Sequence, residues 1–179
     1  MSVWQIFFLS AVLLNTTKLA DDNNQPLEFR CDSMELMSNP NKTICRGNVI
    51  ARKGSWMVCC DKFIGNADNK WQWGSFVCKK NVRVSRVFET AWADKATYSM
   101  EQTKLVLEGQ PMLERGANLL LGKRIIIDFV RDSASINSPR GVMKDSEAIK
   151  DDFEKTSPID ISGPLPAKCP IKPRPNFKL

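Results

Sequence analysis

The chain has 179 residues, of which 42% are hydrophobic and 26% are charged. This length and composition predict one domain, or one domain with a tail, and exclude a membrane-embedded helical bundle. Lys and Arg outnumber Asp and Glu by 26 to 20, so the net charge of +6 favours anionic partners without choosing among them. The absence of histidine excludes a Ser-His-Asp triad, an imidazole base and a His-containing zinc site. With no P-loop and no nucleophile elbow either, we expect no enzyme and no cofactor.

The N-terminus carries an apolar run, Val3–Leu14, followed by Asn15 and two threonines. The run is too short to cross a bilayer as a helix, but it fits the hydrophobic region of a secretory signal peptide. No Lys or Arg precedes the run, and Lys18 lies close to the expected cleavage after Ala20. We therefore expect residues 1–20 to be a signal peptide, with an uncleaved membrane anchor or a buried N-terminal helix as alternatives. Export would allow disulfides to form.

The body of the chain has the pattern of strands. Apolar and polar residues alternate in Leu27–Cys31 and in Val82–Val84, and the run Trp56–Cys60 could bury either face. Thr103–Leu107 and Leu119–Phe129 are aliphatic enough for core strands. Glycines separate these segments at turns or bulges, namely Gly47, Gly54, Gly109, Gly116 and Gly122.

An internal repeat runs through these strands. Asp32–Gly47 and Asp94–Gly109 have the same length, and a shorter echo relates Cys60-Asp61-Lys62 to Ala93-Asp94-Lys95. Asn48-Val49 has a similar counterpart in Asn81-Val82. A unit of two strands and two turns cannot bury its own apolar face, whereas stacked units can. The repeat therefore predicts an elongated β-structure.

The C-terminal part, residues 144–179, differs in composition. Residues 144–155 are charged and could form one short helix. From Thr156 onward six prolines exclude a helix or a central strand. We expect residues 156–179 to be an extended, mobile tail. It is either an appendage or a segment that folds back and is held by Cys169.

A family resemblance rests on four stretches. P-L-E-F-R-C-D-S-M-E-L (residues 26–36) precedes G-N-V-I-A-R-K-G-S-W-M-V-C-C-D-K-F (residues 47–63). A-D-K-A-T-Y-S-M-E-Q-T-K-L-V-L-E-G-Q (residues 93–110) precedes L-L-L-G-K-R-I-I-I-D-F (residues 119–129). In order and spacing the region 26–143 resembles the OstA-like domain of the LptA family. Two departures are Pro111, in place of a strand-forming valine, and Lys80, in place of a glycine.

The resemblance implies an all-β, elongated, open V-shaped jellyroll over residues 26–143. It also implies a periplasmic protein that carries lipopolysaccharide from the inner to the outer membrane. Such a carrier needs an apolar trough, because each exposed methylene of an acyl chain costs about 0.8 kcal/mol. The alternative is that the inward residues simply fill a closed core. The inward residues expected to contact lipid are Phe29, Val49, Trp56, Val58, Val82, Val84, Leu105, Leu107, Leu120, Ile125 and Ile127.

The resemblance also implies partners that add strands at the two ends of the jellyroll. These partners are jellyrolls of the inner and outer membrane, or further copies of the chain joined head to tail. The residues expected at the joints are Leu27, Phe29, Cys31, Ile125, Ile127, Phe129 and Ile136. Basic residues at strand ends are either solvated or placed near the slit to meet lipid phosphates. They are Arg46, Arg52, Lys53, Lys79, Lys80, Lys123 and Arg124.

Two other functions stay open. One is an inner-membrane-anchored relative of the same pathway, and the other is a structural envelope protein cross-linked through cysteines. Nucleic acid is not an expected partner, because the aromatic residues cluster in core strands and do not alternate with Lys and Arg.

Six cysteines are candidates for disulfides, without a C-x-x-C pair among them. Cys59 and Cys60 are adjacent in an expected strand, so their side chains point to opposite faces. Cys60 shares a face with Trp56 and Val58 and should lie inside, near Cys31 or Cys45. Cys59 should point outward, where Cys78, Cys169 or another chain could pair with it.

Overall fold

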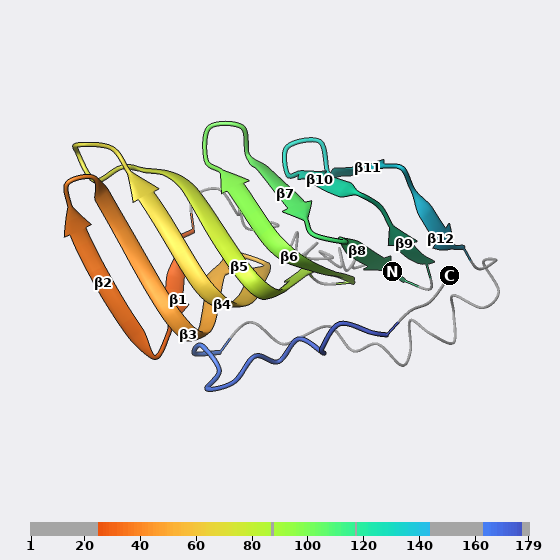
Figure 1. Ribbon diagram of the computed structural model, residues 1–179, viewed down its shortest axis with the longest axis horizontal. Helices are drawn as coiled ribbons and strands as arrows, with labels where there is room; N and C mark the ends of the chain where they lie inside the picture. Colours follow the sequence, from red (N-terminus) through yellow and green to blue (C-terminus); the bar gives the residue numbers. More distant parts are fainter. Residues whose placement is uncertain (1–24, 87, 117, 144–162, 177–179) are drawn as a thin grey trace, which may run out of the picture.

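The computed structural model describes residues 25–86, 88–116, 118–143 and 163–176 (Figure 1). The expected signal peptide and the expected helix over 144–155 lie outside the described residues. Within these residues every regular element is a strand, and none of them belongs to a helix long and apolar enough to span a membrane. The strands are β1 (Glu28–Arg30), β2 (Ser33–Ser38), β3 (Asn41–Lys53), β4 (Trp56–Ala67), β5 (Trp73–Arg86), β6 (Glu89–Ser99), β7 (Lys104–Glu108), β8 (Met112–Arg115), β9 (Asn118–Leu121), β10 (Arg124–Asp128), β11 (Ser133–Asn137) and β12 (Arg140–Val142).

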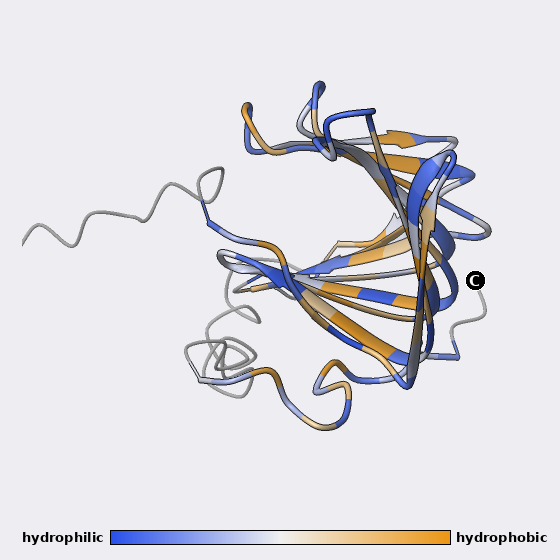
Figure 2. Cartoon of the chain, turned by 90° about the vertical axis from the view of Figure 1, so that its left-hand side faces the viewer, coloured by the Kyte–Doolittle hydropathy of each residue, from blue (hydrophilic) through white to orange (hydrophobic). Residues whose placement is uncertain are grey.

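The strands form one antiparallel sheet of 12 strands that folds along its middle into an open V (Figure 2). Four long strands, β3 to β6, cross the fold line and contribute to both walls. Wall A contains β2, residues 41–46 of β3, 62–67 of β4, 73–79 of β5, 95–99 of β6, β7, β10 and β11. Wall B contains β1, residues 49–53 of β3, 56–60 of β4, 82–86 of β5, 89–93 of β6, β8, β9 and β12.

Register shifts mark the fold line. They occur between Arg46 and Val49 in β3, between Cys59 and Lys62 in β4, and between Lys79 and Val82 in β5. A bulge bends a strand and increases its twist, so aligned bulges turn one sheet into two walls. Three repeated corners occupy this line. The first corner comprises Asp32, Gly47 and Asn48, the second Asp61, Lys80 and Asn81, and the third Asp94, Gly109 and Gln110.

The corners explain the internal repeat. Gly47 and Gly109 have φ of 74° and 79°, in the left-handed region that favours glycine. An added Cβ would lie 2.2 Å from Asp32 Oδ2 at Gly47 and 2.5 Å from Asp94 Cβ at Gly109. Lys80 takes the same left-handed conformation, with φ of 65°. The lysine that departs from the repeat in sequence therefore keeps its geometry.

The walls share an interior core along the fold line. Its fully buried members come from both walls, for example Val49 and Val84 from wall B and Leu107 and Ile125 from wall A. This arrangement confirms the expected all-β, open jellyroll.

The tail, residues 163–176, is an extended strap along the outer face of wall B, drawn in blue in Figure 1. Arg52 of β3 donates to the Gly163 carbonyl near its start, and Arg83 of β5 donates to the Ile171 carbonyl over 3.1 Å. Cys169 is joined to Cys59 of β4 by a disulfide. Of the two alternatives for the tail, the described part therefore folds back and is held by Cys169.

Candidate functional site

A trough lies between the walls on the side away from the fold line. It encloses a cavity of about 100 Å³ and is lined almost entirely by apolar side chains. Both walls contribute, because inward residues alternate along strands of each wall. The lining residues are Leu27, Ala51, Arg52, Lys53, Trp56, Val58, Phe63, Phe76, Cys78, Ala96, Tyr98, Leu105 and Phe129.

Aromatic rings extend along the trough. Phe63 stacks on Phe76 with ring centroids 5.4 Å apart, and Phe76 stacks on Tyr98 at 6.3 Å. Phe129 meets Tyr98 edge to face at 5.4 Å. Burial raises the pKa of Tyr98 above its ordinary value of 10.0, so its phenol stays neutral. The row forms an apolar, uncharged surface suited to hydrocarbon.

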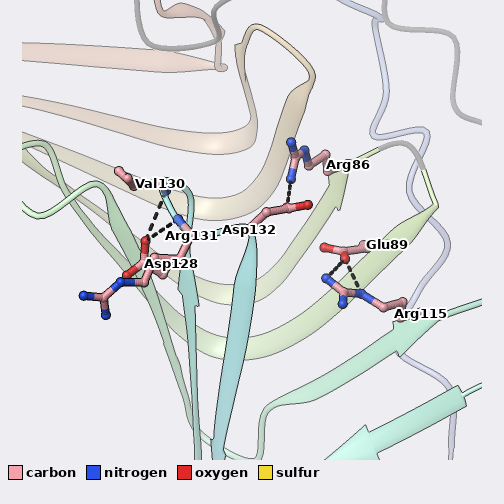
Figure 3. A network of polar contacts seen from close by, with 7 residues as sticks. All are labelled: Arg86, Glu89, Arg115, Asp128, Val130, Arg131 and Asp132. Carbon is pink, nitrogen blue, oxygen red and sulfur yellow. Dashed lines mark hydrogen bonds and ion pairs between the residues drawn. The ribbon is translucent and has the colours of Figure 1, made fainter. Parts of the chain in front are cut away.

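The two walls touch at the mouth of the trough. Trp56 of wall B meets Phe129 of wall A edge to face, with centroids 4.3 Å apart. Beside this contact, Arg86 of wall B pairs with Asp132 of wall A (Figure 3). The Arg86 guanidinium lies 5.2 Å from the centre of the Trp56 ring. These contacts bridge the mouth at one position along the trough.

The turn that carries Asp132 is fixed by Asp128. One carboxylate oxygen of Asp128 accepts hydrogen bonds from the amides of Val130 and Arg131, at 3.1 and 3.0 Å (Figure 3). The Arg131 bond, assisted by that from Val130 and by Lys104, holds the pKa of Asp128 below its ordinary value. Asp128 therefore stays ionised and keeps the turn aimed at wall B.

Both ends of the V expose apolar side chains and free strand edges. At the β1–β2 end, Phe29, Met34 and Leu36 are 39%, 51% and 62% exposed. At the opposite end, Val142 and Met143 are 42% and 75% exposed. Within the described residues, β2 pairs only with β3 and β11 only with β10, so each leaves one backbone edge unpaired. Such edges accept further strands.

The structure places the residues expected to contact lipid in different parts of the V. Trp56, Val58 and Leu105 line the trough, and Phe29 is exposed near its β1 end. Leu120 is half-buried on β9. The remaining residues are at most 5% exposed in the shared core, namely Val49, Val82, Val84, Leu107, Ile125 and Ile127.

The expected downstream joint needs a correction. Ile125 and Ile127 lie on β10, whose two backbone edges pair with β7 and β11. No edge is left there for a partner strand. Ile136 lies on β11, the outer strand of wall A at this end, and Phe129 lines the trough. At the other end Leu27 also lines the trough, while Phe29 and Cys31 lie on and beside the short strand β1.

The basic residues expected near the slit lie at different places in the structure. Lys53 lines the trough at the mouth, whereas the Arg52 guanidinium lies on the outer face of wall B, where it pairs with Glu28 and donates to the Gly163 carbonyl. Arg46, Lys79, Lys80, Lys123 and Arg124 lie beside the fold line, at the opposite end of the strand segments from the mouth. For these five the slit position is wrong: the strands bend at Arg46, Lys79 and Lys80, and Lys123 and Arg124 lie at the turn into β10, at the fold-line end of wall A.

Cys59 and Cys60 point to opposite faces of the sheet, as expected for adjacent residues of a strand. Cys59 points outward and pairs with Cys169 at a Cα separation of 6.0 Å, whereas Cys60 is buried with Cys45 and Cys78 inside the V. Cys31, Cys45, Cys60 and Cys78 are free thiols. Burial and a hydrogen bond with Cys31 raise the pKa of Cys45 to about 12, so it is a poor nucleophile.

Phe63, Phe76 and Tyr98 of the trough were missed by sequence reasoning. Strict alternation from Cys60 places Lys62 and Ile64 inside, but the bulge at Asp61 shifts the facing by one residue, so Phe63 points inward. The same shift at Asp94 turns Ala96 and Tyr98 inward. The Cys60-Asp61-Lys62 and Ala93-Asp94-Lys95 echo was the available signal, since it marks both corners.

The chemistry available to the trough is binding. Among the residues that the structure describes, no group of three or more Cys, Asp or Glu could hold a metal ion. Apolar and aromatic walls can exclude water from a hydrocarbon chain, and a cation at the mouth, Lys53, can face an anionic headgroup.

Comparisons with known proteins agree with this geometry. A family model described as LptA/(LptD N-terminal domain) LPS transport protein matches residues 29–133. The fold is similar to the crystal structure of LptH from Pseudomonas aeruginosa, described as the LptA-homologous periplasmic component of a lipopolysaccharide transport device. That match has a TM-score of 0.64 and 17% identity, and it covers 69% of this chain and 99% of LptH. No curated protein sequence matches the chain.

Proposed function

The chain belongs to the LptA and LptD N-terminal domain family of lipopolysaccharide transport proteins, and we propose that it carries lipopolysaccharide through the periplasm as a bridge between membranes. The family is one of transport proteins, and we infer no catalytic step. The observation that supports this role best is an apolar trough between the walls of an open V whose two ends carry exposed apolar side chains and unpaired strand edges.

The trough would keep the acyl chains of lipopolysaccharide out of water. An acyl chain in water costs about 0.8 kcal/mol per exposed methylene, so a chain of a dozen carbons cannot cross an aqueous space unshielded. The aromatic row from Phe63 to Phe129 would shield the chains, and the mouth would leave sugars and phosphates outside. Lys53 is the cation of the trough lining placed to meet those phosphates.

The two ends would extend the trough from protein to protein. A partner strand would add to β1 or β2 at one end and to β11 or β12 at the other, which keeps the apolar floor continuous. Membrane-anchored jellyrolls of the pathway would join in this way. Copies of the chain itself could also join head to tail, because such contacts do not close into a ring.

Photo-crosslinking in cells tests the cargo. A benzoylphenylalanine at Trp56 should capture lipopolysaccharide, whereas the same probe at Val77, on the outer face of wall A, should not. Equal capture at both positions, or none at Trp56, would overturn the proposal. The absence of glycolipid would favour a structural envelope protein, and an intact mass that still includes residues 1–20 would favour an anchored relative.

A charge in the trough tests the lining. Val58→Asp should reduce lipopolysaccharide capture at least tenfold while secretion continues, because a carboxylate among acyl chains has no partner. The control Val77→Asp should bind normally. Normal binding by Val58→Asp would remove Val58 from the site.

A further inference from the structure

The first two corners hold themselves together. At the first, the Asp32 amide donates to the Gly47 carbonyl at 3.0 Å, and Asn48 Nδ2 donates to Asp32 Oδ2 at 2.9 Å. At the second, Asn81 Nδ2 donates to Asp61 Oδ2 at 2.8 Å. In each corner an asparagine with positive φ ties the aspartate of the neighbouring strand. Asparagine suits this role because it tolerates the left-handed conformation and carries a short amide donor.

The third corner lacks that asparagine. Its backbone bond is present, from the Asp94 amide to the Gly109 carbonyl at 3.3 Å, but Gln110 occupies the asparagine position with φ of 51°. Among the described contacts, the Asp94 carboxylate accepts its hydrogen bond from Arg174 of the strap, at 3.2 Å. Arg174 also donates to the Gly109 carbonyl at 3.3 Å. One side chain from the strap thus reaches both partners of the corner.

The strap is anchored upstream of Arg174. Cys169 is bonded to Cys59, and Ile171 is 1% exposed in a cluster with Ile50 and Met57 of wall B. The Trp92 indole donates to the Lys172 carbonyl at 2.9 Å. These contacts fix residues 169–172 on wall B, so Arg174, two residues further on, is held at the corner.

We propose that the strap is a clasp for the fold line. Arg174 replaces the missing asparagine of the third corner, and the Cys59–Cys169 disulfide holds Arg174 there. The third corner, which joins the walls at β6 to β8, therefore depends on the oxidation state of Cys59 and Cys169. The first two corners are independent of this disulfide. The clasp does not depend on the identity of the cargo, so its tests need no lipid.

Reduction should release the clasp. A thiolate of dithiothreitol attacks the more exposed sulfur, Cys169 Sγ, and Cys59 leaves as a thiolate that takes up a proton. The second thiol of the reagent then resolves the mixed disulfide, so the protein gains two thiols and the reagent becomes the cyclic disulfide. The other four cysteines are already thiols, so the reagent acts at one place.

Amide hydrogen exchange in the full-length, isotope-labelled protein tests the clasp, with the first corner as an internal control. In Arg174→Gln, exchange of the Asp94 amide should accelerate about tenfold, as expected for the loss of a charge-assisted contact, while the Asp32 amide changes less than about twofold. Cys169→Ser and dithiothreitol should accelerate the Asp94 amide in the same way.

A rescue variant separates the clasp from general loosening. Adding Gln110→Asn to Arg174→Gln should restore slow exchange at Asp94, because the third corner then resembles the first. Equal acceleration at Asp32 and Asp94, or failure of the rescue, would overturn the role of Arg174. An Asp94 amide that responds to Arg174→Gln but not to dithiothreitol would overturn the role of the disulfide.

Discussion

The outer faces of the two walls are built from the same long strands but meet their surroundings differently. The outer residues of wall B include Ile50, Met57 and Trp92, each 1% exposed beneath the strap. The outer face of wall A carries a row of cations in direct register, Arg46, Lys62, Lys79 and Lys95. The two faces therefore differ in what lies against them: a segment of the same chain on wall B, and charged side chains beside the fold line on wall A, next to a half-buried apolar row that includes Ile64, Val77 and Val106.

Removal of the disulfide, which ties the strap to wall B, should cause the largest loss of stability. Cys169→Ser opens a link between residues 110 positions apart, and a native disulfide of this loop length contributes about 2–5 kcal/mol to the free energy of unfolding. Urea unfolding without reductant measures the loss. The double variant with Cys59→Ser should lose no more than the single one, and an unchanged midpoint would mean that the strap adds no stability.

Truncation of one side chain on each outer face compares the walls directly. Ile171→Ala should cost about 2 kcal/mol or more, because the side chain is buried between the strap and wall B. Val77→Ala on wall A should cost less than about 1 kcal/mol, because that side chain is only half-buried. Thermal unfolding of both variants gives the ranking, and equal losses would contradict the contrast.

The row of cations should respond to a change of sign. Like charges directly opposite one another destabilise a sheet, so Lys79→Glu, which lies between Lys62 and Lys95, should stabilise wall A by up to about 1 kcal/mol. The gain should disappear at about 1 M salt, where charges are screened within about 3 Å. Lys70→Glu, in a turn outside the row, is the matched control and should change the melting temperature little. A gain that persists at high salt would have another cause.

The smallest expected effect concerns the turn that joins the walls at the mouth. The pKa of Asp128 is lowered in the folded state, so its contribution to stability is complete above the ordinary value of 3.8 and is lost as the pH falls through the lower folded pKa. The amide signals of Val130 and Arg131 should therefore shift with a midpoint below pH 3.8. Shifts centred at or above that pH would show that the carboxylate is not held by these amides.

Much of the fold could be predicted from the sequence, because alternating apolar and polar residues mark the strands and turn residues mark their ends. The strands, the stacked repeat and the opposite facing of Cys59 and Cys60 all follow from a side-chain period of two. The trough was less accessible. Its aromatic row lies beyond bulges at Asp61 and Asp94, where the period slips by one residue, and a period-two pattern cannot detect the slip.

The strap was the least accessible part. Prolines correctly exclude regular structure from this segment, but they contain no information about where an extended chain docks. Ile171 and Arg174 are single residues without periodicity, and their partners lie 65 or more positions away. Only the three-dimensional placement of wall B turns them into an anchor and a clasp.

The direction of the strap has a mechanical consequence. The strands succeed one another along the long axis of the V, so a pull along this axis acts along the hydrogen bonds between neighbouring strands and would part them pair by pair (Figure 1). The strap runs parallel to the same axis from β3 to the third corner, and it is covalently tied at β4. Tension that would separate β4 from β6 is therefore shared by the strap, through the disulfide at β4, the backbone of residues 169–174, and the hydrogen bonds of Trp92 and Arg174 at β6.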